Sequence, residues 1–99
     1  MKHEIEVEGP YFEYSSPYGH ATLLRDVWYV SRRLDPEECT TESQRITSQR
    51  YYAKITQFDN QRRYIVNGEY SNHEFRSLKA AVEYVTTCIV PEKDKTVDG

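Results

Sequence analysis

Aromatic and basic side chains recur in the centre of the sequence. If the segments that carry them are strands, one exposed sheet face would present Tyr29, Arg33, Tyr52, Lys54 and Arg63. Tyrosine rings can stack on nucleobases while lysine and arginine hold phosphates. Tyrosine and arginine are also enriched where proteins bind other proteins. A third interpretation is a solvated sheet face, in which tyrosine serves strand propensity and cross-strand pairing.

Acidic residues occupy every second position near the N-terminus. Glu4, Glu6 and Glu8 alternate with a mainly apolar set, which is the period of a half-buried strand. Their spacing of roughly 6–7 Å approximates that of successive phosphates, so this strand could compete for a nucleic-acid-binding surface on a partner. The alternative is an edge strand that its charges protect against aggregation. Such a strand would repel a second copy of itself, and we therefore expect a monomer.

The nucleophilic and metal-ligating residues form no recognisable catalytic or metal-binding pattern. The three histidines and two cysteines lack the paired spacings of metal sites. Cys39 stands among glutamates, which disfavour a reactive thiolate. Cys88 falls beside an apolar helical stripe, where we expect it to act as a small hydrophobic side chain. No glycine-rich phosphate loop is present. We therefore expect no enzyme, no catalytic residue, no cofactor and no metal site.

Length and composition indicate one small, acidic, soluble domain. The chain has 99 residues with 37% hydrophobic content, a low value that nine tyrosines partly offset because they bury a ring. The formal charge of −3 argues against a dedicated phosphate-backbone binder. No apolar run approaches the roughly 18 residues of a membrane span, and residues 1–10 lack the apolar segment of a signal peptide. We expect a cytoplasmic protein without membrane contact, with Cys39 and Cys88 as free thiols.

The N-terminal half is predicted to hold two strands separated by irregular segments. The first strand covers residues 3–8 and ends at Gly9-Pro10. Residues 11–22, rich in aromatic, serine, proline and glycine residues, are predicted to form a loop whose rings either recognise a partner or complete a small core. A second strand spans residues 26–34. Residues 35–49 are predicted to form a long polar loop, with a helical turn at 36–39 capped by Asp35.

The C-terminal half is predicted to be a three-strand meander followed by a helix. The strands cover residues 50–58, 61–66 and 69–75, and Asn67-Gly68 favours a type I′ hairpin turn. Ser77 is a helix N-cap, an apolar stripe follows at helical spacing, and Pro91 ends the helix. The predicted fold is α+β: an antiparallel β-meander of three to five strands packed on one C-terminal α-helix. Residues 1–90 form the single domain and residues 91–99 a disordered tail.

Residues 50–90 carry a layout that resembles a known class of DNA-binding module. The segments YYAKI, YIVNG and FRSLKAAVEYV are similar in arrangement to the three-strand-plus-helix modules of AP2-type and integrase arm-binding domains. The resemblance implies that the exposed sheet face would lie in the major groove and present arginines and aromatic rings. This chain departs from those modules because it is acidic, with Asp and Glu interleaved throughout.

The acidic balance favours a protein partner over nucleic acid. We therefore expect a small non-catalytic interaction module, of the kind that phages and other mobile elements carry to bind and inhibit or modulate a host protein. Its contact residues would be the central basic and aromatic set or the acidic strand at residues 4–8. The alternative is a nucleic-acid-binding domain that uses the same exposed sheet face.

Overall fold

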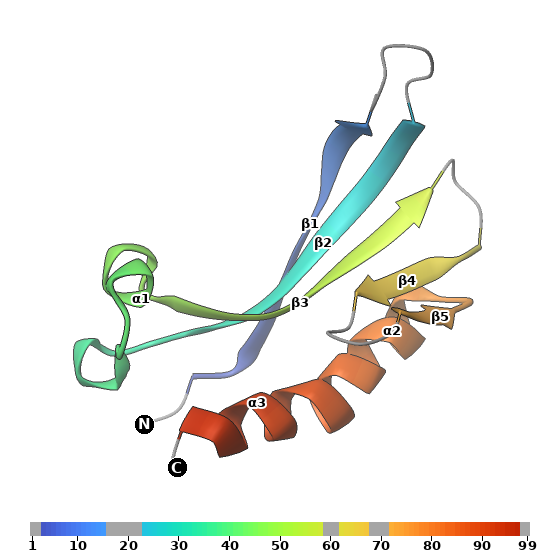
Figure 1. Ribbon diagram of the computed structural model, residues 1–99. Coiled ribbons are helices and arrows are strands. Elements are labelled where there is room, and N and C mark those ends of the chain that lie inside the picture. The colour runs from blue at the N-terminus through green and yellow to red at the C-terminus, as the bar shows by residue number, and fades with distance from the viewer. Residues whose placement is uncertain (1–2, 16–22, 59–61, 68–71, 98–99) are drawn as a thin grey trace.

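A computed structural model of the chain describes residues 3–15, 23–58, 62–67 and 72–97. Five strands form one antiparallel sheet in chain order, and a long C-terminal helix lies along one side of it (Figure 1). The predicted α+β meander with one C-terminal helix is therefore confirmed. The strands are β1 (Ile5–Ser15), β2 (Leu23–Arg33), β3 (Gln49–Phe58), β4 (Tyr64–Asn67) and β5 (Asn72–Phe75). The helical segments are η1 (Pro36–Glu38), α1 (Glu42–Thr47), α2 (Leu78–Tyr84), η2 (Val85–Ile89) and α3 (Val90–Val97).

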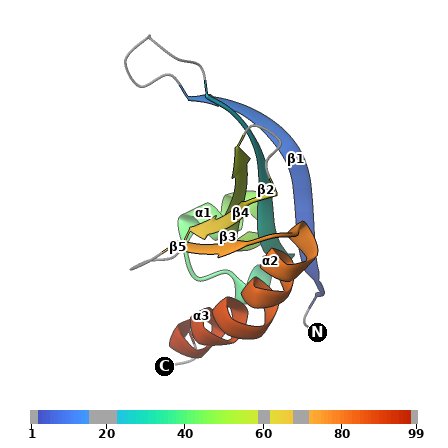
Figure 2. The same ribbon diagram turned by 90° about the vertical axis from the view of Figure 1, so that its right-hand side faces the viewer.

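The core lies between the sheet and the C-terminal helix. Burial of apolar side chains from both layers is the main force that holds the helix against the strands. The buried residues of this cluster are Trp28, Val30, Tyr52, Ile55, Val66, Ala81, Val85 and Val90. The long strands β1 and β2 bend as they extend beyond the helix (Figure 2).

The first strand is longer than predicted. β1 runs through Gly9-Pro10 to Ser15, so the expectations that it ends there and that a loop begins at residue 11 were wrong. The pairing with β2 shifts register between Glu8 and Tyr11, which absorbs the irregularity as a bulge. Gly9 has a φ of +140°, and a Cβ there would lie 2.7 Å from the Val27 carbonyl oxygen. Glycine is thus what allows the strand to continue. Residues 16–22 lie outside the described part.

A second bulge, in β3, changes which side chains face the helix. Ser31 pairs with Tyr51 and Val30 pairs with Ala53, so Tyr52 is an extra residue without a partner in β2. The bulge turns Tyr52 toward the helix, where only 2% of it is exposed. The prediction that Tyr52 shares the exposed face with Lys54 was therefore wrong, because strict alternation fails at a bulge.

The segment between β2 and β3 contains more helix than predicted. The expected turn is confirmed as η1, with Asp35 as its N-cap and Pro36 in its first turn. The further helix α1 was not predicted. The Thr41 side chain caps it by accepting a hydrogen bond from the Gln44 amide, and Ser48 ends it with a left-handed φ of 56°. This segment is therefore ordered by capping and not by apolar anchors.

The hairpin between β4 and β5 has a longer connection than predicted. Val66 pairs with His73 and Asn67 with Asn72, whereas a two-residue turn at Asn67-Gly68 would pair Val66 with residue 69. The third strand of the meander accordingly begins at Asn72. Residues 68–71 themselves, like the predicted turn at residues 59 and 60, lie outside the described part of the chain.

The C-terminal helix begins as predicted and ends later. The Ser77 hydroxyl accepts a hydrogen bond from the Ala80 amide, which confirms the N-cap. The prediction that Pro91 stops the helix was wrong, since α3 continues to Val97. The turn just before Pro91 is a π-helix, in which the Val90 amide bonds to the Val85 carbonyl. A proline in a helix lacks a donor and clashes with the carbonyl four residues earlier, and the wider turn accommodates this defect.

Candidate partner-binding surface

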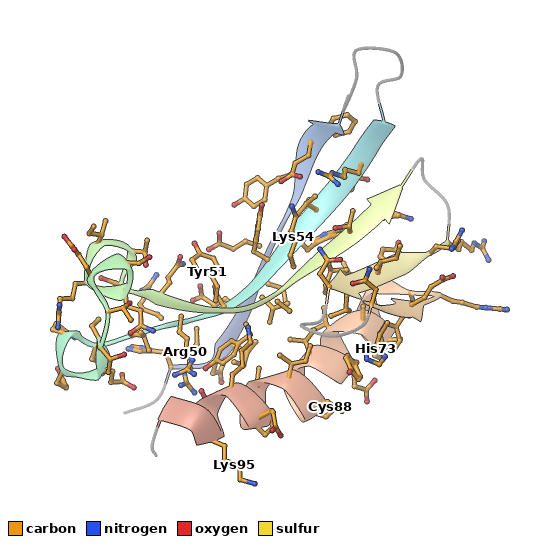
Figure 3. All side chains as sticks on the ribbon, in the orientation of Figure 1. Arg50, Tyr51, Lys54, His73, Cys88 and Lys95 are labelled. Carbon is orange, nitrogen blue, oxygen red and sulfur yellow. The ribbon has the colours of Figure 1, made fainter. Side chains whose placement is uncertain are left out.

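The sheet face that points away from the C-terminal helix is called the open face here. Pairing places Glu8 beside Tyr29 and Tyr29 beside Lys54, and directly paired residues share a face. Figure 3 shows Tyr51 and Lys54 on this side and Arg50 on the helix side. The open face of strands β1 to β3 includes Glu6, Glu8, Tyr11, Glu13, Arg25, Val27, Tyr29, Ser31, Arg33, Gln49, Tyr51, Lys54 and Thr56.

Three tyrosines cross the open face in a row, one on each strand. The ring centroids of Tyr11 and Tyr29 are 5.8 Å apart, and those of Tyr29 and Tyr51 are 6.2 Å apart. Both separations fall in the range of favourable aromatic pairs. Tyr11 and Tyr51 are 47% and 51% exposed, while Tyr29 between them is half-buried. The row therefore presents the phenol rings of Tyr11 and Tyr51 to solvent, and each of them packs against the half-buried ring of Tyr29.

One carboxylate organises the charges beside this tyrosine row. Glu13 lies 3.2 Å from both the Lys54 ammonium and the Arg25 guanidinium, and it accepts a 3.1 Å hydrogen bond from the Tyr29 hydroxyl. The hydrogen bond from Lys54 is the main cause that lowers the pKa of Glu13. Burial, with the bond to Glu13, raises the pKa of Tyr29. These residues, called the Glu13 cluster, hold two cations on one carboxylate.

A matching cluster lies on the opposite side of the sheet, under α3. Asp94 lies 3.3 Å from Arg32 and 3.6 Å from Arg50, and accepts a 2.8 Å hydrogen bond from the Tyr52 hydroxyl. Both guanidinium groups also lie within 6 Å of the Tyr52 ring centroid, which is cation–π range. Burial and then the hydrogen bond to Asp94 raise the pKa of Tyr52 to about 12. We call these residues the Asp94 cluster.

The structure separates the predicted central set into three places. Tyr29 and Lys54 meet on the open face, and Arg33 lies exposed at the end of β2 on the same face. Tyr52 belongs to the Asp94 cluster. Arg63 precedes β4 and makes an exposed 2.8 Å ion pair with Glu74 on β5, apart from the other four.

The predicted acidic strand shares the open face with the basic residues. Glu6 and Glu8 lie on it, half-buried, and Glu8 accepts a 3.1 Å hydrogen bond from the Tyr11 hydroxyl. That bond raises the pKa of Tyr11. Glu4 precedes β1 and is exposed. The two candidate surfaces of the sequence are thus largely one surface of mixed charge.

Sequence reasoning missed Glu13 and Asp94, the two residues that hold the clusters together. Glu13 fell in a segment predicted to be a loop, and Asp94 in a predicted tail. A signal for Asp94 existed: it stands four residues after the buried Val90, which places both on one face of a continuing helix.

A shallow open depression lies at the edge of β3, where β4 ends. Its volume is about 460 Å³, within the range of small ligand sites. It reaches from the tyrosine row to the C-terminal helix. The residues that line it are Tyr29, Tyr51, Tyr52, Ala53, Lys54, Asn67 and Lys93.

Neither cysteine lies in a reactive arrangement. Cys39 is half-buried, and its thiol donates to the carbonyl oxygens of Asp35 and Gln44 at 3.6 and 3.5 Å. Cys88 is exposed on the helix, so its predicted role as a buried hydrophobic side chain was wrong. Among the described residues, no group of three histidine, cysteine or acidic side chains could hold a metal ion. No helix in the described part of the chain has the length and apolar character that a membrane crossing requires.

Comparison with known proteins returned no relative of this chain. No protein-family model, no curated protein and no solved structure matches it.

Proposed function

We propose that this chain is a non-catalytic protein-interaction module that binds, and thereby inhibits or modulates, a partner protein through its open face. The observation that carries the proposal is the tyrosine row, with Tyr11 and Tyr51 about half exposed on either side of Tyr29. Tyrosines on a sheet are rigid, amphipathic contact groups that lose little conformational entropy on binding. Their mutual contacts hold the rings in place before a partner arrives.

The charges of the open face favour protein over nucleic acid. Lys54 and Arg25 lie against one carboxylate, that of Glu13, and so do not form the open row of cations that a phosphate backbone requires. Glu6 and Glu8 lie on the same face and would repel a phosphate backbone. A mixed-charge surface of this kind suits a protein partner, because complementary charges provide specificity. The antiparallel sheet therefore suits a sheet-based contact, and the charges of its open face do not favour DNA as the target.

The proposal is tested by affinity capture from a bacterial lysate, with and without nuclease, at low and high salt. The expected result is one host protein retained in all four conditions. The double variant Tyr11→Ser/Tyr51→Ser should lose it. The control variant Ile46→Ser should keep it, because Ile46 is a 77% exposed apolar residue on α1, outside the strands that form the open face.

Two outcomes would contradict the proposal. Retention of nucleic acid that nuclease removes and high salt abolishes would instead support the nucleic-acid alternative. Retention of the same host protein by the double tyrosine variant would show that the open face is not the contact surface. Circular dichroism and thermal unfolding of all variants establish that each one folds.

A further inference from the structure

The edge of β3 is incompletely paired, and this is the feature on which the inference rests. β4 pairs with residues Ile55, Thr56 and Gln57 only and ends at Asn67. Within the described part of the chain, residues 49–53 of β3 therefore have no strand partner on the side away from β2. An unpaired edge presents backbone donors and acceptors that another strand can use.

The depression lies beside this edge. Ala53 of β3 and Asn67 of β4 line it, together with Tyr29 and Tyr51 from the open face and Lys93 from the C-terminal helix. The Lys93 ammonium donates a 2.9 Å hydrogen bond to the backbone carbonyl of Tyr52. That bond shows that a group outside the sheet can reach this strand and hydrogen-bond to its backbone.

The depression is positively charged although the chain as a whole is acidic. Its lining contains two lysines, Lys54 and Lys93, and no carboxylate. The Glu13 cluster and the Asp94 cluster adjoin it on the two sides of the sheet, and each holds two cations on one carboxylate. The local charge favours an anionic occupant.

We propose that this edge of β3 binds an extended acidic segment of a partner protein as an added strand. The inference rests on the proposed function and specifies the partner's chemistry. The backbone of the segment would pair with residues 49–53 of β3, as in other cases of strand addition. Neighbouring side chains on a strand point to opposite faces of the sheet. Carboxylates at adjacent positions would therefore meet Lys54 on the open face and Lys93 on the helix side, and the other side chains on the open-face side would contact the tyrosine row.

Lys93 occupies a backbone acceptor of this edge that an incoming strand would use. In the free protein it covers the edge by bonding to the Tyr52 carbonyl, which protects an exposed strand from unwanted pairing. An incoming strand would supply an amide for that carbonyl and a carboxylate for the ammonium. The site thereby favours an acidic strand, because a basic strand would bring like charges to Lys54 and Lys93.

The test selects binders from a library of random short peptides displayed on phage, with the full chain as bait. Enriched sequences are expected to hold acidic residues at adjacent positions, which face opposite sides of a strand, within an apolar or aromatic strand pattern. The best sequence is then synthesised, and its dissociation constant is measured by calorimetry. Lys54→Glu and Lys93→Glu should each weaken binding about tenfold, because each replaces an attraction by a repulsion.

Lys95→Glu is the matched control, because Lys95 is exposed on the same helix and points away from the sheet (Figure 3). It should leave the dissociation constant within about twofold. A synthetic peptide with alternate backbone amides methylated should lose binding, since it cannot form the strand bonds. The milder variant Lys93→Gln, which should weaken binding in the same direction, serves if Lys93→Glu fails to fold.

Each failure points to a different fault. Enrichment of no peptide, or of peptides without acidic residues, would overturn the inference. So would equal loss with Lys95→Glu, or unchanged binding of the methylated peptide. A single-stranded oligonucleotide that competes for the edge when no peptide does would also overturn it. If the lysate partner still depends on Tyr11 and Tyr51 in any of these cases, the proposed function stands and only the strand-addition site is lost.

Discussion

The hydroxyl of Tyr52 donates a 2.8 Å hydrogen bond to the Asp94 carboxylate, and this bond ties the bulge of β3 to the last helix. The two residues are 42 positions apart in sequence. Arg32 and Arg50 surround them, so the charges of the helix and of two strands meet at a single carboxylate.

Tyr52→Phe should reduce the free energy of unfolding by about 2 kcal/mol, because it removes a hydrogen bond to a charged acceptor while keeping the ring. Urea denaturation followed by circular dichroism measures the change. Tyr51→Phe is the matched control. It removes an exposed 2.7 Å hydrogen bond to Gln49 and should change stability by less than about 0.5 kcal/mol. An equal loss of unfolding free energy in both variants would mean that the bond to Asp94 contributes no more than an exposed hydrogen bond.

Stability should fall steeply in alkaline solution. The pKa of Tyr52 rises from 10.0 to about 12 in the folded protein. Above pH 10 the unfolded chain therefore loses this proton while the folded chain keeps it, and the free energy of unfolding falls by about 1.4 kcal/mol per pH unit. The contribution is complete below pH 10 and is lost as the pH rises through about 12.

Tyr29 and Tyr11, whose pKa values are also raised, act in the same direction. Urea titrations across this range should show a shallower slope for Tyr52→Phe, and an unchanged slope would refute the assignment.

Asp94→Asn should destabilise the fold by about 3 kcal/mol, because it leaves two largely buried guanidinium groups without a counter-charge. Amide hydrogen exchange should show the loss first in α3, which the carboxylate holds to the sheet. Glu92→Gln, an exposed change two residues away, should have an effect below about 0.5 kcal/mol. A small effect of Asp94→Asn would mean that apolar packing alone retains α3.

The Glu13 cluster predicts a specific shift in titration. Lys54→Met should raise the pKa of Glu13 toward its usual 4.5, because the hydrogen bond from Lys54 is what lowers it most. Carboxyl-detected NMR titration measures this directly. Arg63→Met is the reciprocal control: it should raise the pKa of Glu74 and leave Glu13 unchanged. A lowered pKa also means that Glu13 stabilises the fold above pH 4.5 and that this contribution is lost as the pH falls below it.

Gly9→Ala should destabilise the protein by about 2 kcal/mol or more. The φ of +140° is strained for any side chain, and the new Cβ would lie 2.8 Å from the Trp28 ring and 2.7 Å from the Val27 carbonyl. Ser48→Gly serves as the opposite case, because it relieves a left-handed φ of 56° and should not destabilise by this mechanism. Thermal unfolding of both variants is the measurement. A harmless Gly9→Ala would show that β1 can relax around the bulge.

The parts of the fold that local patterns specify were predictable. Ser77 and the apolar stripe after it identified the helix, and alternation identified β2 and β3. These patterns involve residues that are close together in the sequence, so they can be recognised without knowledge of the tertiary structure. The order of the strands follows because successive antiparallel segments pair with their neighbours.

The candidate site was harder to predict, because it depends on three irregularities. One extra residue in β3 moves Tyr52 to the other face, and the bulge at Gly9 keeps Glu13 in a strand. The wide turn before Pro91 keeps Asp94 in a helix. The irregularities at Gly9 and before Pro91 have local causes, but the contacts that depend on them, such as that of Tyr52 with Asp94, join residues far apart in the chain, so no local window of sequence reveals the site.

The π-turn at Val85–Ile89 fixes the rotational phase of everything after it. A π-turn holds one residue more than an α-helical turn, so winding the same residues as a regular α-helix would rotate the following segment by about 100° about the helix axis. Asp94 would then point away from Arg32 and Arg50, and Lys93 would leave the edge of β3. The wide turn therefore sets the direction in which the side chains of α3 point. It determines that Asp94 faces the two arginines and that Lys93 faces the edge of β3.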